Sequence, residues 1–259
     1  MGNLPQHRVT PGGFPFENVA LDYAGPIQAV TRQGRGCKVT KVYIGIFVCC
    51  ATKAIHLKLV GDLTSNTFIL ALRRFISRRG KPTNIYSDNG TSFVGAYNEI
   101  SKFIKASCDG LTDTMASDGV FFHFIPAYSP HFAGVAEAGV KSTKYHLVRV
   151  LGQCNLTYEE LNTTLVQIEA LLNSSPLTPL SSSPEDLTPL TPGHFLIGRP
   201  LVSLPSPELR DRSTNTLTRF HRIEQLRQHF WSRWSKEYIF EQTPHTFRLE
   251  RNGVQARGH

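Results

Sequence analysis

The apolar residues of this chain recur with two different spacings, which predict strands and helices in alternation. Runs of β-branched and aromatic residues predict strands over residues 16–22, 39–50, 54–60, 85–86 and 120–125. Apolar residues at helical spacing predict helices over residues 64–79, 94–108 and 135–151. The second and third strands pair most simply as a hairpin beside the first, and the first helix then forms a crossover to the fourth strand.

Turn and cap residues set the ends of these elements. Thr64 can cap the first helix, and Gly80 ends it. The breaker Tyr-Ala-Gly-Pro over residues 23–26 is expected to end the first strand at Asp22, and an Asn-Gly turn places Asp88 at the end of another strand. Because sites in open α/β sheets gather at the carboxyl ends of strands, the two aspartates are candidates for a shared site.

The region after the core contains a helix and a proline-rich stretch. Thr157 and Glu160 form a capping box that begins a packing or dimerisation helix. Its apolar face consists of Leu161, Leu165, Ile168 and Leu172. Residues 176–207 carry eight of the sixteen prolines, which favours an extended connector or one ordered by docking.

A long basic helix is predicted near the C-terminus. Its apolar positions are Leu217, Phe220, Ile223, Leu226, Phe230 and Trp234, and the cations around them are Arg219, Arg222, Arg227, Arg233 and Lys236. A solvated face on a partner-seeking helix and a DNA-contacting face are equally open interpretations. The chain thus divides into an N-terminal arm (1–15), an α/β core (16–175), a proline-rich connector (176–213) and a basic helical extension (214–259).

Composition narrows the class of partner. A chain of 259 residues with 40% hydrophobic residues can form one domain with a core and an appended extension. Its 28 Lys and Arg against 20 Asp and Glu give a net charge of +8, which favours a polyanion, above all nucleic acid. Many basic proteins bind nothing, so charge alone leaves the question open. No basic amphipathic helix opens the chain, so no membrane partner is expected.

Cysteine usage and targeting signals add mainly exclusions. The five cysteines form no Cys-x-x-Cys pair, so neither a disulfide framework nor a zinc knuckle is indicated. The first thirty residues hold no apolar leader segment, and no stretch of eighteen apolar residues occurs. A soluble, intracellular protein without a recognisable targeting signal is expected.

Three acids could converge above the sheet: Asp22, Asp88 and Glu137, the last in the first turn of the helix over 135–151. Taken singly, Asp88 fits a turn residue, and Glu137 fits a helix-stabilising pair with Lys141. Together, three close carboxylates repel one another unless cations lie among them. Hard oxygen ligands without His or Cys suit two Mg²⁺ or Mn²⁺ ions, which catalyse in-line phosphoryl displacement.

Two lysines share the helix face of Glu137. Lys141 and Lys144 follow it at i+4 and i+7, which places all three side chains on one side. We expect these ammonium groups to hold the phosphates of a substrate strand. A basic chain with such a site indicates a nucleic-acid phosphodiester as substrate.

The order of these residues resembles the catalytic core of retroelement integrases, most closely the BEL/Pao class of long-terminal-repeat retrotransposons. That family has an Asp after its first strand, an Asp in a Ser-Asp-Asn-Gly word and a Glu on the helix after the catalytic loop. Here these are Asp22 in Leu-Asp-Tyr-Ala-Gly-Pro, Asp88 in Ser-Asp-Asn-Gly-Thr and Glu137 in Ala-Glu-Ala-Gly-Val-Lys. Further similar words are Ala-Thr-Lys-Ala-Ile-His over 51–56 and Leu-Thr-Pro-Gly-His-Phe-Leu-Ile-Gly over 190–198.

The resemblance implies an RNase H-like fold, with a five-stranded mixed sheet flanked by helices. It implies a metal-dependent polynucleotidyl transferase that removes nucleotides from element DNA ends and joins the freed 3′ hydroxyl to target DNA. Asn89, Thr91 and Tyr128 occupy places that lie near DNA in similar integrases. A homo-oligomer is expected, in the nucleus when it acts on chromosomal DNA and otherwise in the cytoplasm.

The chain also departs from the family pattern. Before the Glu the family has two glycines and a tryptophan, whereas this chain reads Ala-Gly-Val-Ala over residues 133–136. No zinc-binding His-His-Cys-Cys module precedes the core, since only His7 lies before Pro15. A core excised from a longer polyprotein, or a decayed copy, is expected. A catalytically silent, domesticated nucleic-acid-binding protein and a related transposase therefore stay open as alternatives.

Overall fold

A computed structural model of the 259-residue chain describes residues 13–87, 93–98, 119–124, 134–152, 154–180, 188–201 and 205–242. Within these ranges, residues 134–140, 215 and 238–242 are described by their backbone alone. The strands of the main sheet are β1 (Asn18–Val30), β2 (Val39–Cys49), β3 (Ile55–Val60), β4 (Asn84–Ser87) and β5 (Phe121–Phe124). The larger helices are α2 (Ser65–Arg79), α4 (Gly134–Leu151), α5 (Tyr158–Leu172) and α7 (Arg219–Gln242).

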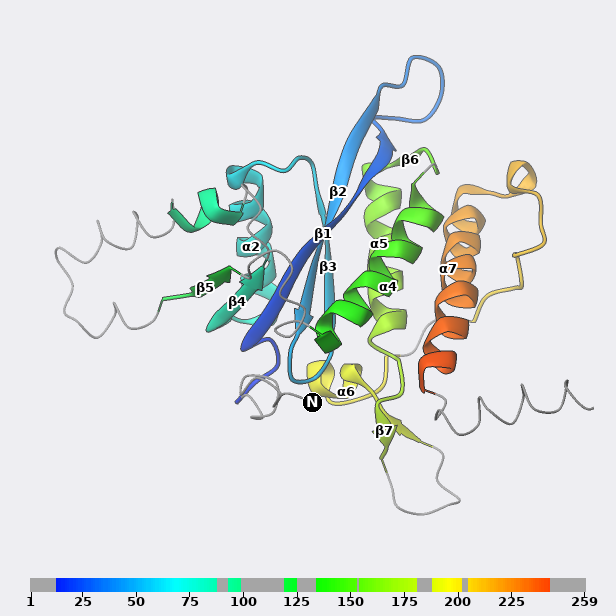
Figure 1. The fold of residues 1–259 in the computed structure, drawn as a ribbon. Coiled ribbons are helices and arrows are strands. Elements are labelled where there is room, and N and C mark those ends of the chain that lie inside the picture. The colour runs from blue at the N-terminus through cyan, green and yellow to red at the C-terminus, as the bar shows by residue number, and fades with distance from the viewer. Residues whose placement is uncertain are drawn as a thin grey trace, which may run out of the picture.

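The sheet has the strand order β3-β2-β1-β4-β5 (Figure 1). Strand β2 runs antiparallel to both of its neighbours, whereas β4 and β5 run parallel to β1. A two-residue strand, β6 (Leu156–Thr157), extends the sheet by pairing with the end of β1. The predicted fold class, an α/β domain with a five-stranded mixed sheet flanked by helices, is confirmed, and so is the β2–β3 hairpin beside β1.

Helices cover both faces of the sheet and divide the core in two. Helix α2 lies on one face, α4 and α5 lie on the other, and α7 forms an outer layer against α4 and α5 (Figure 1). Val19 and Leu21 of β1 join the apolar cluster under α2, while Ala20 and Ala24 join the cluster under α4 and α5. Because side chains alternate along a strand, Asp22 faces the α4 and α5 side.

Strand β1 does not end where the sequence predicted. It runs through Asp22, which pairs with Ile46, and continues to Val30, so the prediction that Asp22 ends its strand is wrong. A register shift between Ala24 and Ile27 accommodates the Gly25-Pro26 dipeptide. A bulge leaves one residue outside the ladder, so a proline without an N–H group is tolerated there. The breaker therefore bends the strand without ending it.

The edge strand β3 is protected by side chains of the following helices. The side-chain amide of Asn173 accepts from the Ile55 amide and donates to the Ile55 carbonyl, both over 2.8 Å. Glu169 accepts from the Leu57 amide over 2.8 Å. These bonds satisfy the backbone groups of an edge that could otherwise pair with another chain. The helix that the Thr157 capping box begins thus packs within this chain.

Glu169 joins the two helical layers around the β3 edge. It also contacts His56 of β3 and Arg79 at the end of α2. Burial opposes ionisation of Glu169, yet the hydrogen bonds from His56 and Leu57 and the charge of Arg79 hold the pKa of its carboxyl below the ordinary value. The acid is therefore charged and paired on several sides.

The C-terminal helix packs on the core along part of its predicted apolar stripe. Phe230 and Trp234 are buried, whereas Phe220 is 63% exposed, so the prediction fails at the beginning of α7. His146 of α4 bonds Glu237 of α7 over 2.6 Å.

The segment between α5 and α7 contains the short strands β7 (Thr178–Pro179) and β8 (Pro189–Leu190), the short helix α6 (Pro192–Ile197) and a 3-10 turn over Thr214–Thr216. Among the described residues, no helix has the length and apolarity needed to cross a membrane.

The charged side chain of Lys58 lies in an environment that disfavours a positive charge. This β3 residue is only 8% exposed. Burial, followed by the charges of Arg78 and Arg74 on α2, lowers the pKa of its ammonium group, and Glu169 offsets this only in part. A cation whose pKa falls on folding destabilises the folded state while it stays protonated.

We therefore expect Lys58→Glu to stabilise the protein, because a carboxylate would pair with Arg74 and Arg78. The expected gain is about 1 kcal/mol, or about 2–4 °C in melting temperature, with Lys58→Met giving a smaller gain. The exposed Lys41→Glu is the control and should shift stability by less than about 0.5 kcal/mol. A lower melting temperature for Lys58→Glu than for the wild type would contradict the assignment of strain to this charge.

Candidate active site

Asp22 is the candidate-site residue whose side-chain contacts the structure describes most fully. Its Oδ1 accepts from the Tyr23 amide over 2.7 Å. The Nζ atom of Lys144 on α4 lies 3.2 Å from Oδ1 and 3.1 Å from Oδ2. The side chains of Lys144 and Asp22 are 41% and 35% exposed, so the pair is open to solvent. Helix α4 thus places the ammonium group of Lys144 against the carboxylate of Asp22 on the central strand.

The segment that holds Asp88 is fixed to β1 at both of its described ends. Residues 88–92 lie outside the described residues. Ser87, the residue before them, pairs with Leu21 in the parallel β1–β4 ladder. Phe93, the residue after them, stacks on the Tyr23 ring with centroids 4.9 Å apart. Leu21 and Tyr23, which flank Asp22, therefore contact the residues at the two ends of this segment.

The sequence did not single out Tyr23 or Phe93 as site residues. Phe68 of α2 packs edge-on against both rings, which completes a cluster of three aromatic side chains. Burial, with a smaller effect from Asp62, raises the pKa of the Tyr23 hydroxyl, so the ring is neutral. An aromatic residue directly after the first acid, and another five residues after the second, is the signal that could have found this cluster.

Glu137 lies on α4, the helix that reaches Asp22. It precedes Lys144 by seven residues, or about 10 Å along the helix axis, and its side chain lies outside the described residues. The predicted apolar stripe of α4 is confirmed at Leu147 and Leu151, which are fully buried. The helix is thus packed against the sheet by its second half.

The two predicted phosphate-binding lysines have different environments. Lys144 contacts Asp22, whereas Lys141 is exposed and has no ion pair with a side chain that the structure describes. The other predicted site residues, Asp88, Asn89, Thr91 and Tyr128, lie outside the described residues.

The donor chemistry at Asp22 fits a divalent cation. A positive group already lies within hydrogen-bond distance of both carboxylate oxygens, and hard oxygen donors suit Mg²⁺ and Mn²⁺. Of the three predicted metal ligands, Asp22 is the one whose side chain the structure describes. In the described part of the chain, no three His, Cys, Asp or Glu side chains lie close enough together to bind a metal.

A second acid, Glu160, organises the far end of β1. Its Oε2 accepts from the Thr157 amide over 2.8 Å and from Gln33 over 3.0 Å, while Oε1 accepts from Arg219 over 2.7 Å. Burial opposes ionisation, but these bonds lower the pKa of the Glu160 carboxyl from 4.5 to about 2. The capping box was predicted, whereas its links to the β1–β2 hairpin and to α7 were not.

Solved structures similar to this chain include the following two. A chain from the intasome of simian T-cell lymphotropic virus, solved in complex with PP2A regulatory subunit B56 gamma, is 16% identical with a TM-score of 0.47. The match covers 80% of this chain and 64% of that chain, so this chain spans less than two thirds of its length. The HTLV-2 integrase catalytic core domain, solved with magnesium in a trimeric form, is 19% identical with a TM-score of 0.42, covering 71% and 99%.

Comparisons of the sequence match only a short part of this chain. A family of unknown function (DUF5641) matches residues 218–252, a range that includes all of α7. No curated protein matches the chain. At these identities the solved structures concern the fold alone, and the fold class here rests on the strand order of the sheet itself.

Replacing Glu160 tests the link between the hairpin, α5 and α7. Because the folded-state pKa lies below the unfolded value, the charge stabilises above about pH 4.5, and this contribution is lost as the pH falls from about 4.5 toward 2. Glu160→Gln should lower the free energy of unfolding by about 1–2 kcal/mol at pH 7. The difference from the wild type, measured by chemical denaturation, should shrink at pH 3. An equal difference at both pH values would show that the charge is not the cause.

Proposed function

We propose that this protein is a metal-dependent polynucleotidyl transferase of the integrase type, which processes element DNA 3′ ends and joins them to target DNA. One observation supports this most directly. The helix that carries Glu137 contacts Asp22 through Lys144, and both flanks of the Asp88 segment contact the neighbours of Asp22. These contacts bring the described neighbours of Asp88 and Glu137 to β1 near Asp22, which supports a shared site for the three acids.

The rigid surroundings of Asp22 suit a role in positioning. The Tyr23 amide holds Oδ1, and the ladder partner Ile46 keeps the backbone of Asp22 in the centre of the sheet. A ligand on a central strand is held more precisely than one on a loop. Two divalent ions, when bound, would activate the attacking oxygen and stabilise the leaving oxygen of an in-line displacement.

The proposed reaction has two steps of the same kind. Water attacks a phosphorus atom near the element end, the bond from phosphorus to the 3′ oxygen breaks, and the proton that the water loses is balanced by the proton that the leaving 3′ oxygen takes up. The freed 3′ hydroxyl then attacks a target phosphorus, forms a new phosphodiester and displaces a target 3′ oxygen. Lys141, exposed on the helix of Glu137, is placed to attract the phosphates of the bound strand.

The closer family and the partners belong to the same proposal. The BEL/Pao class follows from the local words around the three acids, and DNA as partner agrees with the net charge of +8. We propose a homo-oligomer, since processing and joining two element ends requires two copies of the site.

A catalytically silent DNA-binding protein is the second candidate. The ion pair between Lys144 and Asp22 favours it, because the lysine neutralises the aspartate without a metal. The two candidates assign different roles to the acids. An enzyme needs all three charges for chemistry, whereas a binding protein needs none of them.

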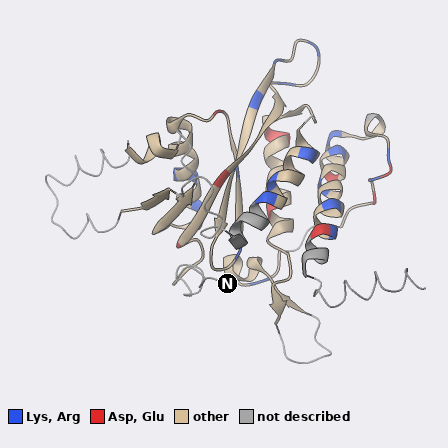
Figure 2. Cartoon of the chain, in the orientation of Figure 1, with Lys and Arg blue, Asp and Glu red and all other residues tan. Residues whose placement is uncertain are grey.

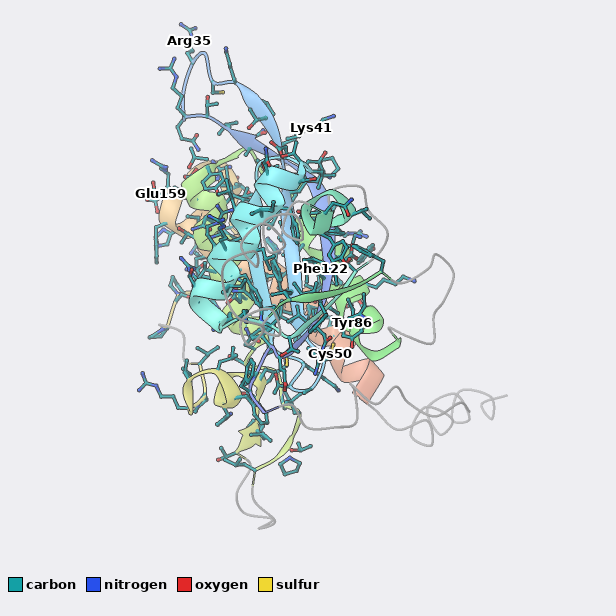
Figure 3. All side chains as sticks on the ribbon, turned by 90° about the vertical axis from the view of Figure 1, so that its left-hand side faces the viewer. Arg35, Lys41, Cys50, Tyr86, Phe122 and Glu159 are labelled. Carbon is teal, nitrogen blue, oxygen red and sulfur yellow. The ribbon has the colours of Figure 1, made fainter. Side chains whose placement is uncertain are left out.

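Removing the charge of Glu137 separates the two candidates. Glu137→Gln keeps the side-chain volume, so strand transfer with element-end oligonucleotides and Mn²⁺ should fall by more than about 100-fold, since loss of even an outer partner of a metal costs up to that much. DNA affinity should hold. Glu159→Gln makes the same chemical change at an exposed position of α5 and should leave transfer unaffected (Figure 3). Wild-type protein that binds DNA but transfers no strand would favour the silent candidate.

A further inference from the structure

The connection between β1 and β2 forms a basic projection that the candidate site does not use. Residues 31–41 are all exposed and include no Asp or Glu. We call this segment the basic arm. It projects beyond the helical layers, with Arg35 at its tip and Lys41 nearer its base (Figure 3). Its cations, visible in Figure 2, are Arg32, Arg35, Lys38 and Lys41.

The basic arm has a defined backbone. The Thr31 amide donates to the Lys38 carbonyl over 3.0 Å, and the Lys38 amide donates to the Thr31 hydroxyl over 3.2 Å. Gly34 and Gly36 adopt φ of +96° and +74°, which L-residues rarely adopt, so the tip turn depends on them. The Arg32 guanidinium donates to the Arg35 carbonyl over 3.3 Å and so lies over the turn.

The base of the basic arm is fixed to the core. Residues Ala29 and Val30 pair with β2 on one side and with β6 on the other. Within the arm, Gln33 donates to Glu160 at the beginning of α5. In the described part of the chain, the four arm cations have no ion pair. Their charge is therefore held in a fixed place and left uncompensated.

We propose that the basic arm binds the phosphate backbone of a nucleic-acid duplex. A two-stranded ribbon fits the major groove, which is about 12 Å wide. Residues 31–38 contain no aromatic side chain on which the bases of a single strand could stack. The one bulky aliphatic side chain of the basic arm, Val39 at the beginning of β2, is 56% exposed, and a single such residue offers too little apolar surface to insert into a membrane. Two glycines at the tip allow a close approach to the sugar-phosphate backbone.

This proposal rests on the proposed function only for the class of substrate, DNA. The arm begins nine residues after Asp22, just beyond the end of β1, or about 30 Å away at the rise of a strand. At 3.4 Å per base pair, the arm would contact the duplex roughly nine base pairs from the phosphate at Asp22. The arm is therefore a binding surface separate from the candidate site, and its role is to hold the DNA away from the reacting end.

The test measures affinity for a 20-base-pair duplex of arbitrary sequence by fluorescence anisotropy over a range of salt concentrations, without metal. The variant carries Arg32→Gln, Arg35→Gln and Lys38→Gln together. Each lost phosphate contact removes about 0.9 from the slope of log K against log salt, so the slope should fall by up to about 2.7. A six-base-pair duplex centred on the candidate site should show a smaller change.

A charge-matched control carries Arg73→Gln, Arg78→Gln and Arg199→Gln, three exposed cations outside the arm and outside α7. It should lose less than one unit of slope. Binding to phosphatidylserine vesicles is measured in parallel. Equal slopes for the arm variant and the wild type would overturn the proposal. An arm variant that loses binding to the vesicles but keeps its binding to DNA would overturn it too. Strand transfer is measured separately, so the arm can fail while the proposed chemistry stands. Loss of transfer in Glu137→Gln with an unchanged salt slope would in turn leave the arm intact.

Discussion

The contact between α4 and β1 at Asp22 is the interaction on which the candidate site depends. Asp22 faces α4 because residues alternate along β1, and Lys144 reaches both oxygens of its carboxylate. Leu147 and Leu151 anchor the same helix in the core, so the position of its first half follows from the packing of its second. Any displacement of α4 would break the ion pair between Lys144 and Asp22.

Buried charges connect the layers around this site. Glu169 joins β3, α2 and the helix α5 that carries it, and Glu160 joins the basic arm, α5 and α7. Each carboxylate is charged because hydrogen-bond donors converge on it, and removing one partner would leave a buried charge poorly compensated. A few polar contacts, together with the apolar clusters, therefore fix the positions of the sheet, the basic arm and the outer helix α7 relative to one another.

Local sequence patterns predicted the elements, but not the contacts between distant parts of the chain. The spacing of β-branched runs gave the five strands, and Thr64, Gly80 and the Thr157 capping box gave helix ends, because each depends on neighbouring residues. The continuation of β1 through Pro26 depends on a bulge against β2, which no local pattern encodes. The pairing of Lys144 with Asp22 likewise joins residues 122 positions apart.

We propose that Asp22 binds a divalent cation in the place that Lys144 occupies. Titration with Mn²⁺, followed by electron paramagnetic resonance of the free ion, tests it directly. Lys144→Met should bind Mn²⁺ up to about fivefold more tightly than the wild type, since an exposed ion pair is worth up to about 1 kcal/mol. Lys141→Met should not, and Asp22→Asn should lose the site. Mn²⁺ binding that is the same in Asp22→Asn and in the wild type would contradict the claim.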